Sequence, residues 1–191
     1  NIAILSDEFL EEVRGMKQKN LAVELLKRLL QGSIKTFSRR NLVKSKKFSE
    51  LLEASIRKYQ NRTIETTQVI MELIALAKEI TEAEKRGEDT GLTPDELAFY
   101  DALAENESAR DSMDDEILKQ IARDLTVKIR NNISIDWSIR ESVQAKMRMI
   151  VKRLLAKYNY PPDKRDSAVD VVLEQTKLMC ENESVSVNRV L

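Results

Sequence analysis

Histidine is absent from this sequence of 191 residues, and cysteine occurs once, as Cys180. Histidine is the commonest general base at neutral pH, so its absence excludes Ser-His-Asp and Cys-His catalytic arrangements. It also excludes every zinc site that contains histidine, and one cysteine can supply neither a set of thiolate ligands nor an internal disulfide. The sequence therefore predicts no metal site and no cofactor site in this chain.

Glycine and proline are scarce as well, with four and three residues. A phosphate-binding P-loop ends in Gly-Lys-Ser/Thr, but the four glycines precede Met16, Ser33, Glu88 and Leu92. Restriction-type nucleases place an acidic residue two positions before a lysine, so that both groups act on one metal-bound phosphate. No lysine here has an acidic residue at that position. We expect no catalytic residue in this chain.

Long apolar runs and a positively charged leader are missing too. Together with the single cysteine, this predicts a cytoplasmic protein that makes no contact with a membrane. Since the chain opens on Asn1 and not on methionine, we expect it to be a fragment of a longer polypeptide.

Apolar residues recur along the chain at spacings of three and four, which is the repeat of an amphipathic helix. Hydrophobic residues make up 42% of the sequence and charged residues 34%, a composition typical of globular proteins. We predict an all-α fold, an irregular bundle of about seven to eight helices. In chain order, the first expected helix begins at Ser6, the second runs from Asn20 to a stop at Gly32, the third spans 45–60, and the fourth spans 63–85 with a stop at Gly87. The fifth begins at Thr93, the sixth spans 114–130, the seventh ends at Tyr158, and the eighth spans 164–180.

The clearest local signal is Thr93-Pro94-Asp95-Glu96, a capping box with proline at the first helical position. Asp136 is expected to cap the helix that ends at Tyr158, and Trp137 to anchor its start on the core. We expect one helical domain over residues 1–183, divisible into lobes 1–90 and 91–183, and a flexible tail at 184–191.

Charge is unevenly distributed although the total is zero. Residues 35–62 contain nine bases and two acids, residues 79–116 three bases and fourteen acids, and residues 119–165 twelve bases and four acids. The basic segments can bind DNA phosphates, pair with the acidic segment, or meet an oppositely charged partner subunit. The candidate contact residues for DNA or a partner are Arg39, Arg40, Lys44, Lys46, Lys47, Arg148, Lys152, Arg153 and Lys157.

Several short stretches in a fixed order point to one protein family. They are Ile4–Leu10, Lys46–Glu50, Glu96–Leu103, Arg130–Asn132, Ile135–Trp137, Arg140–Glu141 and Tyr158–Asp163. With these stretches the chain resembles, over most of its length, the C-terminal helical domain of R subunits of type I restriction-modification enzymes. Asn159 departs from the glycine expected there, which bears on turn geometry and not on function.

The resemblance implies that the parent polypeptide is an ATP-dependent type I site-specific deoxyribonuclease. Its nuclease domain and two helicase-like domains, which use ATP and Mg²⁺, would lie upstream of this chain. The family's catalytic residues map onto no position here. In such enzymes the C-terminal helical region fastens the motor to the methyltransferase core, chiefly its M subunit. The expected partners are therefore the M subunit, the upstream helicase domains and, through the complex, DNA. The alternative is a helical domain that contacts duplex DNA directly through its basic segments.

Overall fold

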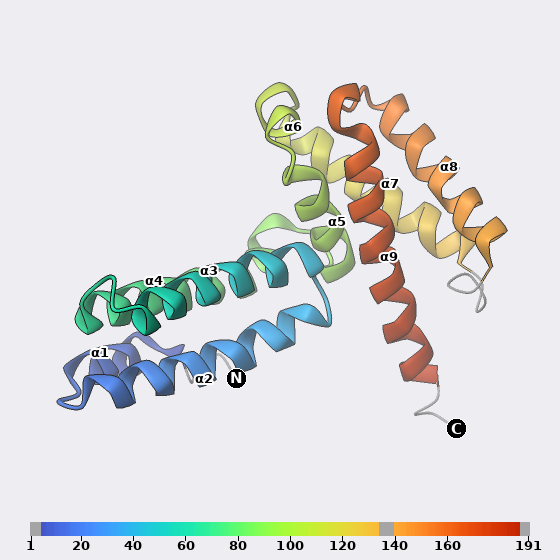
Figure 1. Cartoon of the computed structure of the whole chain (residues 1–191). Coiled ribbons are helices and arrows are strands. Elements are labelled where there is room, and N and C mark those ends of the chain that lie inside the picture. The colour runs from blue at the N-terminus through green and yellow to red at the C-terminus, as the bar shows by residue number, and fades with distance from the viewer. Residues whose placement is uncertain (1–4, 134–139, 188–191) are drawn as a thin grey trace. The chain divides into compact units, whose positions relative to one another are not determined.

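The structure is a computed structural model that describes residues 5–133 and 140–187, and all regular secondary structure in these ranges is helical (Figure 1). The all-α prediction is confirmed. The described residues form nine α-helices and include the 3₁₀ turn η2. The bounds are α1 Asp7–Gly15, α2 Lys19–Ser38, α3 Leu42–Gln60, α4 Thr66–Thr90, α5 Pro94–Ala104, α6 Glu107–Ser112, α7 Asp115–Asn132, α8 Glu141–Lys157, η2 Pro162–Lys164 and α9 Arg165–Val187.

The chain divides into two compact units that interleave in sequence. The first comprises residues 1–38 and 44–90, and the second comprises residues 39–43 and 91–191. The chain thus leaves the first unit after Ser38, contributes five residues to the second unit, and returns at Lys44. The interpretation as one domain with two lobes stays a prediction, and the excursion at 39–43 was not anticipated.

The first unit is built on the packing of α2 against α4. Leu26 and Leu30 on α2, and Leu73 and Ile80 on α4, are fully buried, as the spacing of three and four residues requires. Helix α1 contributes Leu10 to this core, and α3 contributes Phe48 and Leu52. The rings of Phe37 and Phe48 meet edge to face with their centroids 5.4 Å apart.

The second unit is organised around α5, which packs against both α7 and α9. Phe99 and Leu103 of α5 are fully buried together with Ile121 of α7. Tyr160 lies in the same core, and its hydroxyl donates a hydrogen bond of 2.7 Å to the carbonyl of Leu103. Burial raises the pKa of this phenol, because the charged form would lose its hydration. The turn after α8 is thereby fastened to the centre of the unit.

Three predicted helix starts are confirmed in their capping chemistry, whereas α2 begins at Lys19, before the expected Asn20, and α3 begins at Leu42, before the expected residue 45. Ser6 accepts a hydrogen bond from the backbone N–H of Phe9, and Thr93 and Glu96 form both bonds of the capping box. Asp114 caps α7 through the N–H of Glu116 at 2.8 Å. These starts were predictable because side chain and amide lie within three residues of each other.

Three helix ends differ from the prediction. Helix α2 continues through Gly32 to Ser38, since the apolar stripe continues to the buried Ile34. Helix α4 passes Gly87 and ends at Thr90, because the next residue, Gly91, has φ of 65°, the left-handed conformation that stops a helix. Helix α9 extends to Val187, so residues 184–187 are helical where a tail was expected, because no glycine or proline interrupts them.

The expected seven to eight helices correspond to the eight helices of seven or more residues in the described ranges. The ninth, α6, was not predicted, because its six residues carry too little periodicity to reveal it. The capping role of Asp136 and the anchoring role of Trp137 lie outside the described residues.

Candidate docking surface

The described residues show no assembled centre for metal chemistry. Within residues 5–133 and 140–187, no three His, Cys, Asp or Glu side chains come together so as to hold an ion. The side chain of Cys180 is half-buried and packs against the core of the second unit. No helix in these ranges is long and apolar enough to cross a membrane.

The candidate contact residues between positions 39 and 47 belong to two different units. Arg39 and Arg40 belong to the segment 39–43 of the second unit and have exposed side chains. Their backbone carbonyls accept hydrogen bonds from the side chains of Asn182 and Gln175. The backbone of this stretch thus serves the fold, while the two guanidinium groups remain accessible.

Lys44, Lys46 and Lys47 lie in the first turns of α3 in the first unit. Lys44 and Lys47 line a hollow of about 470 Å³ together with acidic residues of α4, among them Glu79 and Glu82. Lysines and carboxylates that share one hollow attract each other, although solvent weakens the attraction. This part of the basic stretch therefore faces the acidic segment of its own chain.

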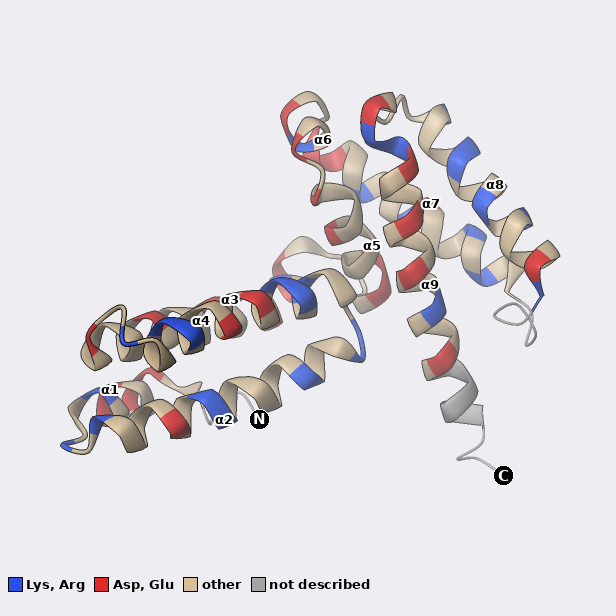
Figure 2. Cartoon of the chain, in the orientation of Figure 1, with Lys and Arg blue, Asp and Glu red and all other residues tan. Residues whose placement is uncertain are grey.

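The second basic stretch lies on α8, beside the acidic residues of α9 (Figure 2). Arg148 pairs with Asp170 at 2.7 Å, and Lys152 pairs with Asp166 at 2.7 Å. The hydrogen bond from Lys152 lowers the pKa of Asp166. These pairs tie α8 to α9.

Arg153 and Lys157 are exposed on the same helix, and the ammonium of Lys157 lies 5.2 Å from the centre of the Tyr158 ring. The nine predicted contact residues are therefore not gathered on one element or in one unit. Their role in binding DNA or a partner stays a prediction.

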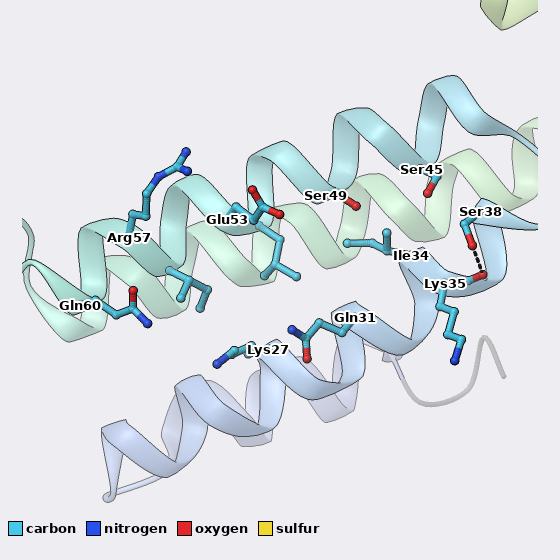
Figure 3. Close-up of a pocket in the computed structure, with 12 residues that line it drawn as sticks. Lys27, Gln31, Ile34, Lys35, Ser38, Ser45, Ser49, Glu53, Arg57 and Gln60 are labelled. Carbon is cyan, nitrogen blue, oxygen red and sulfur yellow. Dashed lines mark hydrogen bonds between the residues drawn. The ribbon is translucent and has the colours of Figure 1, made fainter. Parts of the chain in front are cut away.

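An open groove lies between α2 and α3 of the first unit (Figure 3). It has a volume of about 680 Å³, and both helices contribute a stripe of residues to it. From α2 come Lys27, Gln31, Ile34, Lys35 and Ser38, and from α3 come Ser45, Ser49, Leu52, Glu53, Ile56, Arg57 and Gln60.

The groove is open because small and polar side chains occupy positions at core spacing. Ser49 stands on α3 one turn before Leu52, and Ser45 stands two turns before it, both in line with Leu52 where larger apolar residues would fill the space. The Ser38 hydroxyl donates to the carbonyl of Lys35 at 2.7 Å, within its own helix. The floor is apolar, since Ile34 and Leu52 are buried core residues whose surfaces line it.

The groove was not predicted from the sequence. A signal was available, because serines at positions 45 and 49 interrupt an otherwise apolar stripe that continues with Leu52 and Ile56. Small polar residues in an apolar stripe can either pack in a filled core or leave a groove open. Which of the two occurs depends on the neighbouring helix, and only the tertiary structure shows that helix.

Large apolar side chains are also exposed elsewhere on the helices. Leu51 on α3 and Met71 on α4 are 41% and 57% exposed in the first unit. Ile117 and Val127 on α7 and Met149 on α8 are exposed in the second unit. Single exposed apolar residues are common, so they mark a contact surface only in combination with a shaped site such as the groove.

Comparison with known proteins gives a consistent family. Residues 1–182 match the family described as type I restriction enzyme HindI endonuclease subunit-like, C-terminal. The chain is 39% identical over 181 residues to the type I restriction enzyme HindI endonuclease subunit of Haemophilus influenzae, covering 95% of this chain and 17% of that protein. It is 37% identical over 159 residues to the putative type I restriction enzyme MjaIXP endonuclease subunit of Methanocaldococcus jannaschii, covering 82% of this chain and 15% of that protein.

The chain thus spans about a sixth of the length of these relatives. No solved structure matches it.

Proposed function

This chain belongs to the C-terminal family of HindI-like type I restriction endonuclease subunits, and from that premise we propose that it is a non-catalytic domain that docks the motor subunit onto the methyltransferase core. The partner is the M subunit of the same system. The nuclease and ATPase chemistry, with its ATP and Mg²⁺, belongs to the upstream part of the polypeptide. The complex works in the cytoplasm.

The observation that carries the proposal is the open groove between α2 and α3. A translocating motor needs an anchor that holds under load, and stable protein interfaces bury on the order of 1,200 Å² or more. Two helical units offer rigid surfaces of this kind, because their side chains are fixed by the cores beneath. The groove provides an apolar centre for the interface, and the surrounding charged residues orient the partner as it binds.

The proposal is tested by removing this region from its subunit. The endonuclease subunit, with and without the 191 residues, is titrated against the purified methyltransferase core, and binding is measured by biolayer interferometry. We expect affinity to fall by at least a hundredfold without this region. Equal affinity of both forms would contradict docking. ATP turnover or DNA cleavage by the purified 191-residue chain would contradict its non-catalytic role.

Direct contact with duplex DNA is the alternative, favoured by the exposed side chains of Arg39, Arg40, Arg153 and Lys157. Binding through phosphates releases counterions, so affinity should fall steeply between about 50 and 200 mM salt. Measuring duplex binding over this range decides between the two functions. Tight and strongly salt-dependent binding by this chain alone would favour the DNA-contacting function.

A further inference from the structure

The groove between α2 and α3 has the dimensions of a site for one helix. Its lining residues extend from Lys27 to Ser38 on α2 and from Ser45 to Gln60 on α3. At about 1.5 Å per residue, these stretches correspond to roughly 16 and 22 Å. A helix of about eleven to fifteen residues, or three to four turns, spans that length.

The spacing of the lining residues is that of a helix-packing seam. On α2 the central positions Lys27, Gln31, Ile34 and Ser38 follow each other at intervals of four, three and four residues. The central positions of α3 follow the same intervals, at residues 45, 49, 52 and 56. Such stripes on two neighbouring helices form the holes that receive the knobs of a third helix.

The charge of the groove indicates the chemistry of its occupant. Lys27, Lys35 and Arg57 stand along it against one acid, Glu53, which gives the lining a net charge of +2. Lys27 has an acidic neighbour in Glu24, but the two groups are 4.0 Å apart on the helix surface, where such a pair contributes little. The apolar floor of Ile34, Leu52 and Ile56 does not suit phosphates, which need donors and not methyl groups.

We propose that this groove seats a single amphipathic helix of the M subunit, three to four turns long, with an apolar stripe facing the floor and acidic residues facing Lys35 and Arg57. This inference rests on the proposed docking function and names its site. Association would be steered by the charges and held by the apolar stripe.

The test uses the full-length endonuclease subunit and the purified methyltransferase core. One variant, Lys35→Glu/Arg57→Glu, reverses two exposed charges of the groove. A second variant, Ser49→Phe, fills the groove without changing its charge. The matched control, Lys128→Glu/Lys177→Glu, makes the same charge change at exposed positions on α7 and α9, which do not line the groove. Circular dichroism and urea unfolding verify that each variant is folded.

We expect both groove variants to raise the dissociation constant at least tenfold, and the control to stay within twofold of the wild type. The charge reversal should also invert the dependence of the association rate on salt, because the groove then repels the acidic helix and salt screens that repulsion. Restoring affinity by changing acids to lysines in one helix of the M subunit would identify the occupant.

The outcomes separate the two proposals. If deletion of the 191 residues abolishes binding while folded groove variants bind like the wild type, the groove is the wrong surface and docking stands. If the deletion leaves binding intact, docking itself fails. If the groove variants instead lose affinity for duplex DNA and keep affinity for the M subunit, the groove binds nucleic acid and the inference is overturned.

Discussion

The side-chain amide of Asn41 donates a hydrogen bond of 2.8 Å to the carboxylate of Asp101, and both side chains are almost fully buried. The two residues are sixty positions apart in the sequence, yet both belong to the second unit. A buried carboxylate requires donors, because removing it from water without them is costly. The short segment 39–43 supplies one, so it is an integral part of the second unit and not a linker.

Asn41→Ala should lower the free energy of unfolding by about 2 kcal/mol, the usual cost of removing a buried hydrogen bond to a charged group. Urea unfolding of the purified chain, followed by circular dichroism, measures this difference. The control is Asn131→Ala at an exposed position on α7, which should change stability by less than about 0.5 kcal/mol. Equal effects of the two substitutions would show that the Asn41 bond does not stabilise the fold.

The side chain of Gln175 binds the backbone of segment 39–43. It donates a hydrogen bond to the carbonyl of Arg40 at 2.8 Å and accepts one from the N–H of Leu42 at 3.0 Å. Gln175→Leu keeps the volume but removes both bonds. We expect hydrogen exchange of the Leu42 amide to accelerate at least tenfold, because its N–H loses its acceptor. Amides in the middle of α7 serve as an internal reference. Unchanged exchange at Leu42 would argue against this attachment.

The turn after α8 depends on the left-handed conformation of Asn159, which has φ of 54°. The N–H of Asn159 donates to Ala156 and that of Tyr160 to Leu155, the two bonds of a Schellman motif. Asn159→Gly should keep or raise stability, and Asn159→Ala should lower it by about 1 kcal/mol, since only glycine adopts this conformation without steric cost. Urea unfolding that ranks alanine equal to glycine would contradict this explanation.

Glu72 on α4 gives the first unit a dependence on pH. Its carboxylate accepts hydrogen bonds from Lys58 at 2.9 Å and Ser55 at 2.7 Å. The bond from Lys58, and next that from Ser55, lowers the pKa of Glu72 below its usual 4.5. Because the pKa is lower in the folded state, the stabilisation is complete above pH 4.5 and is lost as the pH falls through the lowered value.

Glu72→Gln should therefore reduce stability at pH 7, by on the order of 0.5 kcal/mol for a partly exposed pair. The difference from the wild type should shrink as the pH is lowered toward 3. Urea unfolding at both pH values measures it, with Glu84→Gln at an exposed position of α4 as the control. A difference that stays constant between pH 7 and 3 would rule out this cause.

Much of the helical structure was predictable, because its signals are local. The capping box at Thr93 and Glu96, the cap at Ser6 and the amphipathic repeats lie within a few residues of each other and need no tertiary information. Gly32 and Gly87 misled the prediction, since a glycine ends a helix only where the chain must turn, and packing of α2 and α4 holds the helix through both.

The candidate site was less accessible to sequence reasoning. The basic residues on α8 were identified as candidate contacts, but the sequence could not show that Arg148 and Lys152 pair with Asp170 and Asp166. Those acids lie more than ten residues away on another helix, and only the packing of α8 on α9 brings them close. The groove was missed for the same reason.

The sequence by itself determined the all-α class, the family and most helix starts, because composition, periodicity and capping act over short distances along the chain. Only the tertiary structure decided that residues 39–43 join the second unit and that α2 and α3 leave a groove open. It also decided that Arg148 and Lys152 form ion pairs with acidic residues of α9. Each of these depends on which helix faces which, and that is set by the joint burial of apolar stripes from distant segments.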